Sequence, residues 1–540
     1  MDRRTFIKAG TVGAAASTVL QPGCATESPT GQTGTGSPQL PDFPLEEATV
    51  AGIQEGLASG EWTARSLTEA YLERIELVDR GLGLNSVIET NPDAVRIAEE
   101  LDAERRNGGS RGPLHGVPVL IKDNIATADG METTAGSHAL LSSRPARDAF
   151  LASRLREAGA VILGKANLSE WANFRSTNSV SGWSGRGGQC KNPYALDRNP
   201  CGSSSGSGAA ASANLATLAV GTETNGSVVC PSSASGLVGI KPTVGLVSRS
   251  GIIPISHTQD TAGPMCRTVV DAATLLTVLA GVDPADPATA RSSGNAAQDY
   301  AAFADPGGLA GARIGVVRSG GFGPKVEAVF EDALAAMRSE GATLVDPVEL
   351  PHMSEIGRYS YQVLLYEFKT DLNAYLAALA STPVVTLEDI IAFNDANASL
   401  EMPYFGQEIM IQAQEKGGLD TPEYLEAVER APRLAGPEGI DRVMDEHRLD
   451  ALVAPTGGPA WTTDLVNGDH FGGGSSSSAA VSGYPNITLP MGMIFGLPVG
   501  LSIWGRAWSE PTLIRLAAGF EAVTGVREAP RFLETADLRI

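Results

Sequence analysis

Residues 201–230, CGSSSGSGAAASANLATLAVGTETNGSVVC, contain two serine-glycine turns separated by an apolar stretch. Upstream, Lys122 lies inside the apolar run GVPVLIKDNI at 116–125. Serine is a weak nucleophile and needs a base that takes its proton. Because burial disfavours the ammonium form, a lysine in an apolar run can be neutral and act as that base. The combination predicts acyl transfer at a serine without a histidine.

The first turn also matches a motif of another hydrolase class. Residues 202–206 fit GxSxG, in which Ser204 would be the nucleophile. That motif requires a strand directly before it, whereas residues 192–200 are polar and contain two prolines. Residues 159–165 match most of a phosphate-binding loop, but Ala166 replaces the Ser or Thr that binds magnesium. We therefore set both motifs aside.

Composition indicates a large globular protein with an acidic surface. The 540 residues include 42 % hydrophobic residues, which suffices for a large core. The net charge is −22, which repels phosphate backbones and disfavours nucleic acid as a partner. The six histidines form no HExxH and the cysteines form no CxxC. We therefore expect neither a metal site nor a cofactor.

The N-terminus resembles a twin-arginine export signal. Residues 1–24 contain Asp-Arg-Arg-Thr-Phe-Ile-Lys, followed by an apolar stretch at 9–20 that is too short to span a bilayer. Cys24 follows a small residue and is a candidate for lipidation. Residues 25–44 are rich in Thr, Ser, Gly and Pro and predict a flexible linker. We expect a periplasmic or lipid-anchored protein whose membrane contact, if any, is through Cys24.

The remaining four cysteines are Cys190, Cys201, Cys230 and Cys266. Export would allow disulfides to form, because secreted proteins leave the reducing cytosol. Spacing alone does not decide which of the four pair.

Strand-like and helix-like segments alternate along residues 45–540. Such alternation is typical of one α/β domain with a sheet covered on both faces. Strands are predicted at 87–89, 117–121, 160–163, 216–220, 314–317, 343–345, 451–454, 486–489 and 499–504. Helices are predicted within 45–75 and at 93–106, 148–158, 209–215, 324–340 and 511–524, and 354–447 reads as mostly helical.

Taken together, these segments resemble the amidase signature family of serine hydrolases, and within it the bacterial peptide amidases. The segment GVPVLIKDNI, the turn CGSSSGS, the block beginning GTETNGSVVCP, and LPVGLSIWG carry the resemblance, which extends over about residues 45–530. It implies a single α/β domain with a mixed central sheet covered by helices, and a Ser-Ser-Lys triad.

The resemblance also assigns roles to individual residues. Ser227 matches the nucleophile, Ser203 the serine that relays its proton, and Lys122 the base. Ser227 follows Ser203 by 24 residues (227 − 203), as the family spacing requires. The backbone amides of Thr224, Asn225, Gly226 and Ser227 match the oxyanion hole.

Three features depart from the family pattern. Asn225 replaces the first of two glycines before the nucleophile, and Asn tolerates unusual backbone angles better than most residues. Cys201 occupies a position where glycine is usual, and Val229-Cys230 replaces an arginine-containing stretch. The triad is intact, so these changes concern substrate preference.

We therefore predict an exported amidase that releases ammonia from a carboxamide, with C-terminal peptide amides as the first candidate substrate. Aryl, fatty or cyclic amides are alternatives, as is a catalytically silent surface protein that binds ligands. The glutamine-hydrolysing subunit of a tRNA amidotransferase shares the motifs, but export and acidic charge disfavour it. The loop at 171–197 and the helical region at 354–447 are expected to shape the pocket.

Overall fold

The computed structural model describes residues 38, 40–318 and 321–539. The predicted signal peptide with Cys24, and residues 25–37 and 39 of the predicted linker, lie outside the described residues. All the described residues belong to one unit, Gly36–Ile540. Within it, no helix combines the length and the apolar character needed to cross a bilayer.

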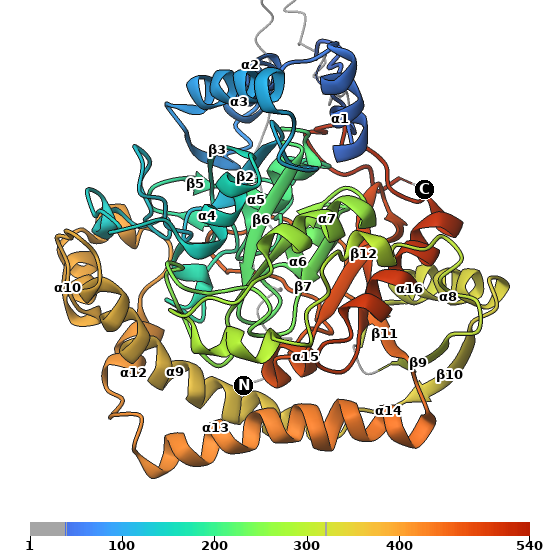
Figure 1. Cartoon of the computed structure of the whole chain (residues 1–540). Coiled ribbons are helices and arrows are strands. Elements are labelled where there is room, and N and C mark those ends of the chain that lie inside the picture. The colour runs from blue at the N-terminus through green and yellow to red at the C-terminus, as the bar shows by residue number, and fades with distance from the viewer. Residues whose placement is uncertain (1–37, 39, 319–320, 540) are drawn as a thin grey trace, which may run out of the picture. The chain divides into compact units, whose positions relative to one another are not determined.

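A mixed sheet runs through the centre of this unit (Figure 1). Its strand order is β1-β3-β2-β6-β8-β7-β12-β13-β11-β9-β10. The strands are β1 Val87–Thr90, β2 Pro118–Lys122, β3 Val161–Ala166, β6 Leu218–Glu223, β7 Val238–Lys241, β8 Thr261–Cys266, β9 Arg313–Val317, β10 Thr343–Val348, β11 Ala451–Pro455, β12 Asn486–Ile494 and β13 Leu497–Trp504. β4 Trp183–Ser184 and β5 Gly188–Gln189 form a separate hairpin.

The sheet contains both parallel and antiparallel pairs. β2 pairs in parallel with β3 and β6, and β9 pairs in parallel with β10 and β11, whereas the other neighbours are antiparallel. Every residue of β2, β3 and β6 is buried, as expected for parallel strands covered on both faces. The predicted class, one α/β domain with a mixed sheet covered by helices, is confirmed.

Helices surround the sheet and bury its centre. The α-helices are α1 Val50–Ser59, α2 Ala64–Arg74, α3 Ala94–Gly108, α4 Phe150–Glu157, α5 Ser205–Ser212, α6 Val229–Ala234, α7 Val269–Leu279, α8 Pro324–Ser339, α9 Met353–Ala377, α10 Leu387–Ala396, α11 Ala398–Glu401, α12 Glu408–Gln414, α13 Pro422–Ala435, α14 Arg442–His447, α15 Ser477–Ser482 and α16 Glu510–Thr524. The 3₁₀ and π turns are η1 Ile75–Arg80, η2 His138–Leu140, η3 Glu170–Asn173, η4 Pro287–Ser292, η5 Ala301–Phe303 and η6 Gly436–Asp441.

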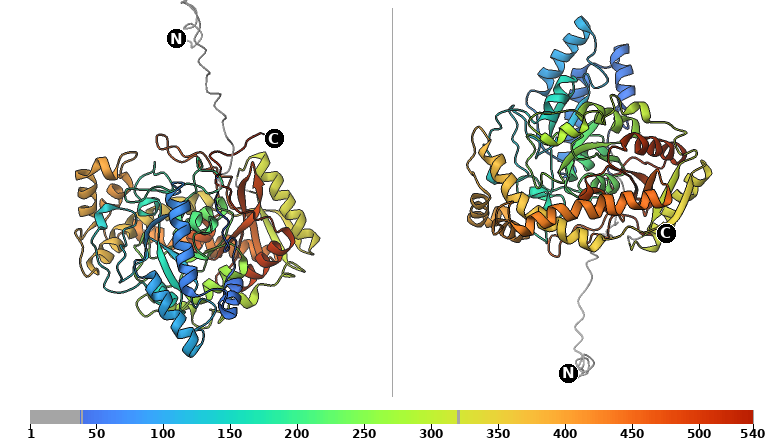
Figure 2. Two further views of the ribbon diagram at one scale, coloured as in Figure 1. Left: turned by 90° about the horizontal axis from the view of Figure 1, so that it is seen from above. Right: turned by 60° about the horizontal axis from the view of Figure 1, so that its bottom comes forward.

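The region predicted as mostly helical contains α9 to α14 and forms its own layer. Figures 1 and 2 show α9 and α13 side by side along the lower edge of the view in Figure 1. The buried face of α9 packs against the loop that follows β3, and Phe368 meets Phe174 edge-to-face with ring centroids 5.1 Å apart. The layer formed by α9 to α14 therefore packs behind the loop that follows β3 and supports it.

Two local predictions differ from the structure, and two strands were not predicted. α5 begins at Ser205 rather than 209, because the small residues of SGSG continue into a fully buried helix. The strand expected at 216–220 is displaced to β6, and β7 and β8 were not predicted. Gly239 lies in β7 and Gly263 in β8, and a glycine makes a strand harder to recognise in the sequence. In the structure, a neighbouring side chain at Gly239 and a neighbouring backbone at Gly263 leave no room for a Cβ atom.

The rejected phosphate loop is a strand. Lys165 lies in β3 with its ammonium fully buried, and its Nζ donates to Ile125 O at 2.6 Å and Thr133 Oγ1 at 2.8 Å. Strand amides pair with the neighbouring strands, so they do not surround a phosphate.

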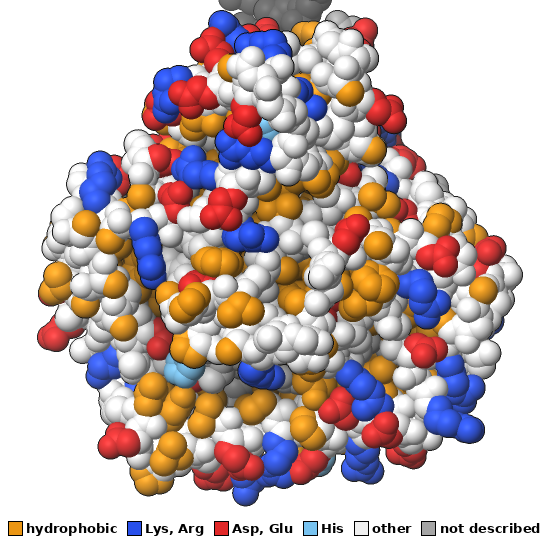
Figure 3. All heavy atoms as spheres, viewed as in Figure 1, with side chains coloured by type: hydrophobic (Ala, Val, Ile, Leu, Met, Phe, Trp, Pro, Cys, Tyr) orange, Lys and Arg blue, Asp and Glu red, His pale blue; other side chains and the backbone are white. Residues whose placement is uncertain are grey.

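On the face in Figure 3, acidic and basic side chains are interspersed with apolar ones.

Candidate active site

Lys122 ends β2 and is completely buried. Its Nζ lies 2.8 Å from Ser203 Oγ, 2.9 Å from Thr222 Oγ1 and 3.0 Å from Ser204 Oγ. Burial lowers the pKa of Lys122 to about 7, against a smaller opposing effect of the carboxylates of Asp260 and Glu223. Near neutral pH, a substantial fraction of Lys122 is therefore the free amine that a base must be.

Ser204 and Thr222 hold this amine in place. Ser204 Oγ donates to Thr222 O at 2.9 Å and accepts from Thr222 N at 3.1 Å. Asn124 Nδ2 donates to Thr222 Oγ1 at 3.0 Å. The hydroxyl of Ser204 is buried and engaged, which agrees with setting GxSxG aside. Sequence reasoning missed Thr222 and Asn124, although both lie in the segments that carried the resemblance.

The two serine turns are adjacent. Ser203 precedes α5 and is buried, and Ser227 follows β6 with 9 % of its surface exposed. The Ser204 N–H donates to Ser227 O at 3.2 Å, which joins the turns. Within the described residues, no hydrogen bond connects the hydroxyls of Ser203 and Ser227. The structure thus brings Lys122 to Ser203, and the transfer from Ser227 to Ser203 stays a prediction.

Glu223 binds the turn at 224–227, which contains the predicted nucleophile Ser227 and is called the nucleophile turn below. Its Oε1 accepts from Gly226 N at 2.8 Å, and its Oε2 accepts from Val228 N at 2.8 Å and Val229 N at 3.1 Å. The N–H of Gly226 is therefore directed at a carboxylate, which departs from its predicted place in the oxyanion hole. Gly226 has φ of 85°, a left-handed conformation that suits glycine.

The other predicted oxyanion donors are the amides of Thr224, Asn225 and Ser227. In the described part of the chain, none of these three N–H groups has a hydrogen-bond partner. They are available to a developing negative charge, and their assignment to the oxyanion hole stays a prediction.

Asp260 anchors the start of the same turn. Its Oδ1 accepts from Thr224 Oγ1 at 2.6 Å, and its Oδ2 accepts from the amides of Ile255 and Ser256 at 2.8 and 2.9 Å. Burial raises the pKa of Asp260 to about 6 despite these bonds. Sequence reasoning missed this carboxylate, since an aspartate in a polar loop has no distinguishing pattern.

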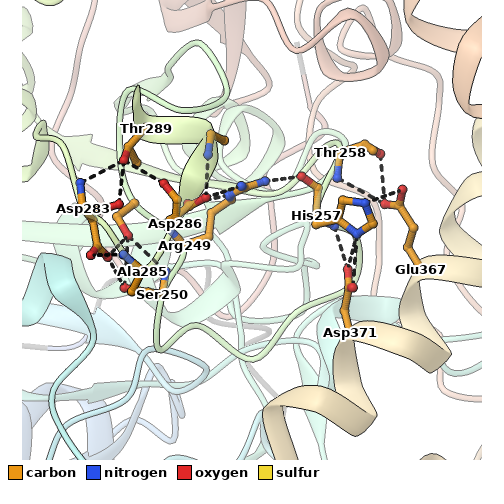
Figure 4. A network of polar contacts seen from close by, with 12 residues as sticks. Arg249, Ser250, His257, Thr258, Asp283, Ala285, Asp286, Thr289, Glu367 and Asp371 are labelled. Carbon is orange, nitrogen blue, oxygen red and sulfur yellow. Dashed lines mark hydrogen bonds and ion pairs between the residues drawn. The ribbon is translucent and has the colours of Figure 1, made fainter. Parts of the chain in front are cut away.

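The segment that delivers Asp260 is tied to distant elements (Figure 4). Arg249 pairs with Asp286 through Nε at 2.8 Å and also donates to His257 O. The amide of His257 donates to Asp371 on α9 at 2.8 Å. The network therefore connects the nucleophile turn to the helical layer.

Three side chains of this network could in principle hold a cation. The ligand atoms of His257, Glu367 and Asp371 lie within 4.8 Å of one another. However, Asp371 faces Nδ1 of His257 at 2.9 Å, while Glu367 faces the opposite nitrogen at 3.3 Å. The hydrogen bond from His257 to Asp371 raises the pKa of His257. Both ring nitrogens of His257 therefore face a carboxylate.

A disulfide bond joins the segment before Ser203 to the segment after Ser227. Cys201 and Cys230 are bonded with their Cα atoms 6.0 Å apart, whereas Cys190 and Cys266 are buried free thiols. Both half-cystines line a cavity of about 410 Å³ beside the nucleophile turn. Its described lining is Asn173, Ser181, Cys201, Gly202, Asn225, Gly226, Val229, Cys230, Thr456, Trp461, Asp469, Phe471, Gly474, Ser476 and Ser477.

The cavity wall partly follows the sequence prediction. The loop at 171–197 contributes Asn173 and Ser181, but no described residue of 354–447 lines the cavity. That helical region instead packs behind the loop. The opposite wall comes from 456–477, which sequence reasoning missed because a Gly- and Ser-rich stretch reads as a connecting loop.

Comparisons with known proteins identify the family of this chain. The family profile described as Amidase matches residues 66–514. A probable amidase of Arabidopsis thaliana is 43 % identical over 500 residues, covering 91 % of this chain and 93 % of the relative. A glutamyl-tRNA(Gln) amidotransferase component from Roseiflexus castenholzii is 34 % identical, covering 89 % of this chain and 96 % of the relative.

Among solved structures, the native peptide amidase of Stenotrophomonas maltophilia is 53 % identical, with a TM-score of 0.87 over 91 % of this chain and 99 % of that one. A complex of a peptide amidase with the competitive inhibitor chymostatin has the same identity and TM-score, covering 90 % and 100 %. The chain belongs to the amidase signature family and is an amidase, a hydrolase that acts on amides.

The pKa of Lys122 predicts the pH dependence of activity. Because the base must be neutral, kcat/KM should rise with pH through about 7 and level off above it. Measuring initial rates of amide hydrolysis between pH 5 and 9 checks this. K122R, which keeps a permanent cation, should lose activity by roughly 10³-fold or more. A wild-type profile that is flat between pH 5 and 9 would contradict Lys122 as the base.

The disulfide predicts a stability change that is separate from the chemistry. It closes a loop with a sequence separation of 29, so replacing both cysteines (C201S/C230S) should lower the free energy of unfolding by about 3–4 kcal/mol. Urea unfolding checks this. Dithiothreitol should shift the midpoint of the wild type and leave that of the double variant unchanged. Equal shifts in both would show that the bond contributes little.

Proposed function

We propose that this amidase hydrolyses the C-terminal amides of peptides to the peptide acid and ammonia. The observation that carries the proposal is the fully buried Lys122, whose amine lies 2.8 Å from Ser203 Oγ beside the turn of Ser227. The 53 % identity to a peptide amidase over nine-tenths of the chain supports the choice of substrate.

In the proposed mechanism, Ser227 Oγ attacks the carbonyl carbon of the amide. The Ser227 proton passes to Ser203 as the Ser203 proton passes to the amine of Lys122. The oxyanion accepts hydrogen bonds from the backbone amides of Thr224, Asn225 and Ser227, each often worth about 3 kcal/mol in the transition state. Preorganised amides are suited to this role because they need no reorientation during the reaction.

Collapse of the tetrahedral species breaks the C–N bond. The Lys122 ammonium returns its proton through Ser203 to the leaving nitrogen, and ammonia departs. Water then attacks the acyl-enzyme while the same relay takes its proton. The second collapse breaks the ester, releases the acid and returns a proton to Ser227. Protons and bonds balance without any further reactant.

The cavity lining is compatible with an amide rather than a free acid. None of the described lining residues is Lys, Arg or His, so a C-terminal carboxylate would have no counter-charge there. Amide and hydroxyl groups of Asn173, Ser181 and Thr456 can hydrogen-bond to a peptide backbone. This favours entry of a neutral terminal amide and departure of the charged product.

Ammonia release from peptide amides tests the proposal. Acetyl-leucyl-glutamine amide is expected to release one ammonia per peptide, whereas glutamine, an anilide, a fatty amide and a cyclic amide should react far more slowly. S227A and K122A should lose activity by roughly 10⁴-fold or more, and S203A by at least roughly 10²-fold. Faster turnover of glutamine would favour the amidotransferase-type reaction. Absence of turnover and of labelling by a fluorophosphonate would favour a silent binding protein.

We further propose that the protein is exported by the twin-arginine route. The paired Arg3 and Arg4 and the apolar stretch at 9–20 support this, and both lie outside the described residues. In a bacterial host, R3K/R4K should move the protein from the periplasmic to the cytoplasmic fraction. C24S should release it from the membrane fraction if Cys24 carries a lipid. Unchanged periplasmic yield of R3K/R4K would contradict this route.

A further inference from the structure

We propose that Asp469, together with Trp461 and Phe471, forms a subsite for a cationic group of the substrate. All three residues line the 410 Å³ cavity beside the nucleophile turn. The inference rests on the proposed function, because the cation is part of the peptide amide whose carbonyl meets Ser227. Hydrolysis of an amide does not by itself require a preference for cationic substrates, so this subsite adds a selectivity to the proposed function.

Three hydrogen-bond donors surround the carboxyl group of Asp469. Its oxygens accept from Ser181 N at 3.0 Å, from Asn199 Nδ2 at 3.3 Å and from Trp461 Nε1 at 3.3 Å. Each of these partners is a donor, and donors stabilise the charged form of a carboxyl group. Burial acts in the opposite direction and raises the pKa of Asp469. These donors therefore fix the position of the Asp469 carboxyl group at the cavity wall and favour its charged form.

The position of this charge is fixed relative to the chemistry. Asn199 donates to Asp469 and also accepts from Cys201 N at 2.8 Å through its Oδ1. Cys201 precedes the turn of Ser203 by two residues and is bonded to Cys230, three residues after Ser227. One side chain therefore links Asp469 to both catalytic turns.

Two aromatic rings accompany the carboxylate. Trp461 and Phe471 meet edge-to-face with centroids 5.8 Å apart, and Phe471 is half exposed. Aromatic faces attract cations electrostatically, and an adjacent carboxylate adds a full charge. Aromatic rings beside a carboxylate therefore suit an ammonium or guanidinium better than a neutral or acidic group.

The rest of the wall does not cancel this charge. Asp469 is the one charged residue of the described lining. The neighbouring His470 is exposed, and its Nε2 faces Asp464 at 3.4 Å. The cavity potential is therefore negative, and the net charge of −22 acts in the same sense at long range.

A cation can reach the subsite from two sources, a basic side chain or the free amino terminus of a short peptide. Acetyl-Leu-Arg amide presents the first and unblocked Leu-citrulline amide presents the second. Acetyl-Leu-citrulline amide, nearly isosteric with the arginine peptide but uncharged, is the reference. The ratio of kcat/KM for each charged peptide to the reference measures the selectivity.

D469N removes the charge and keeps an oxygen acceptor. D464N is the matched control, because it changes the net charge equally in the same loop but at a residue outside the cavity lining. We expect a wild-type ratio of roughly tenfold or more for at least one charged peptide. That ratio should fall toward one in D469N and persist in D464N, which should also turn over the reference peptide at the wild-type rate.

A wild-type ratio near one for both charged peptides, or an unchanged ratio in D469N, would overturn the subsite. If D469N unfolds, F471L tests the same subsite without removing a bond to Asp469, and an unchanged ratio there counts against it. If the wild type hydrolyses no peptide amide, the proposed function fails separately. Calorimetric binding of the charged and reference peptides to S227A then decides the subsite, and equal affinities would overturn it.

Discussion

The burial of Lys122 is the constraint on which the rest of the site depends. A lysine without solvent must either be neutral or find a charge partner, because an uncompensated buried ammonium is costly. Among the described residues, its Nζ hydrogen-bonds only to hydroxyl and carbonyl oxygens, of Ser203, Ser204 and Thr222. Burial that is costly for an ordinary lysine thus lowers the pKa of Lys122 to about 7, which suits its proposed role as the base.

Carboxylates set behind the nucleophile turn provide its rigidity. Glu223 accepts hydrogen bonds from the amides of Gly226 within the turn and Val228 after it, and Asp260 accepts one from the side chain of Thr224 at its start. Asp260 belongs to a segment that is held in turn by Arg249 and by helix α9 (Figure 4). These bonds hold the turn in shape, so the amides of Thr224, Asn225 and Ser227 can point toward a developing negative charge. Oxyanion stabilisation needs donors that are fixed in advance in this way.

Chemistry and substrate recognition come from different parts of the chain. Lys122 lies on β2, and the two serines of the proposed relay lie in the turns before α5 and after β6. Much of the cavity wall comes from the loop after β3 and from 456–477, which lie far apart in sequence. Such a division allows the wall to vary while the buried relay is kept, because loops tolerate change better than a packed core.

The sequence by itself determined the α/β fold and the reaction class, whereas the relay roles of Lys122, Ser203 and Ser227 stay predictions. The fold follows from the alternation of strands and helices, and the reaction class follows from the resemblance of the segments around Lys122, Ser203 and Ser227 to the amidase signature family. Gly226 shows the limit of such patterns, since a turn motif does not reveal that the amide of Gly226 donates a hydrogen bond to the Glu223 carboxylate.

Only the tertiary structure decided the Cys201–Cys230 pairing, the role of Asp260 and the place of Asp469 in the cavity wall. Each depends on segments that are brought together across the sheet or between loops. Composition and periodicity describe one segment at a time and carry no information about which distant segments meet. Contacts of this kind follow from the packing of the whole chain.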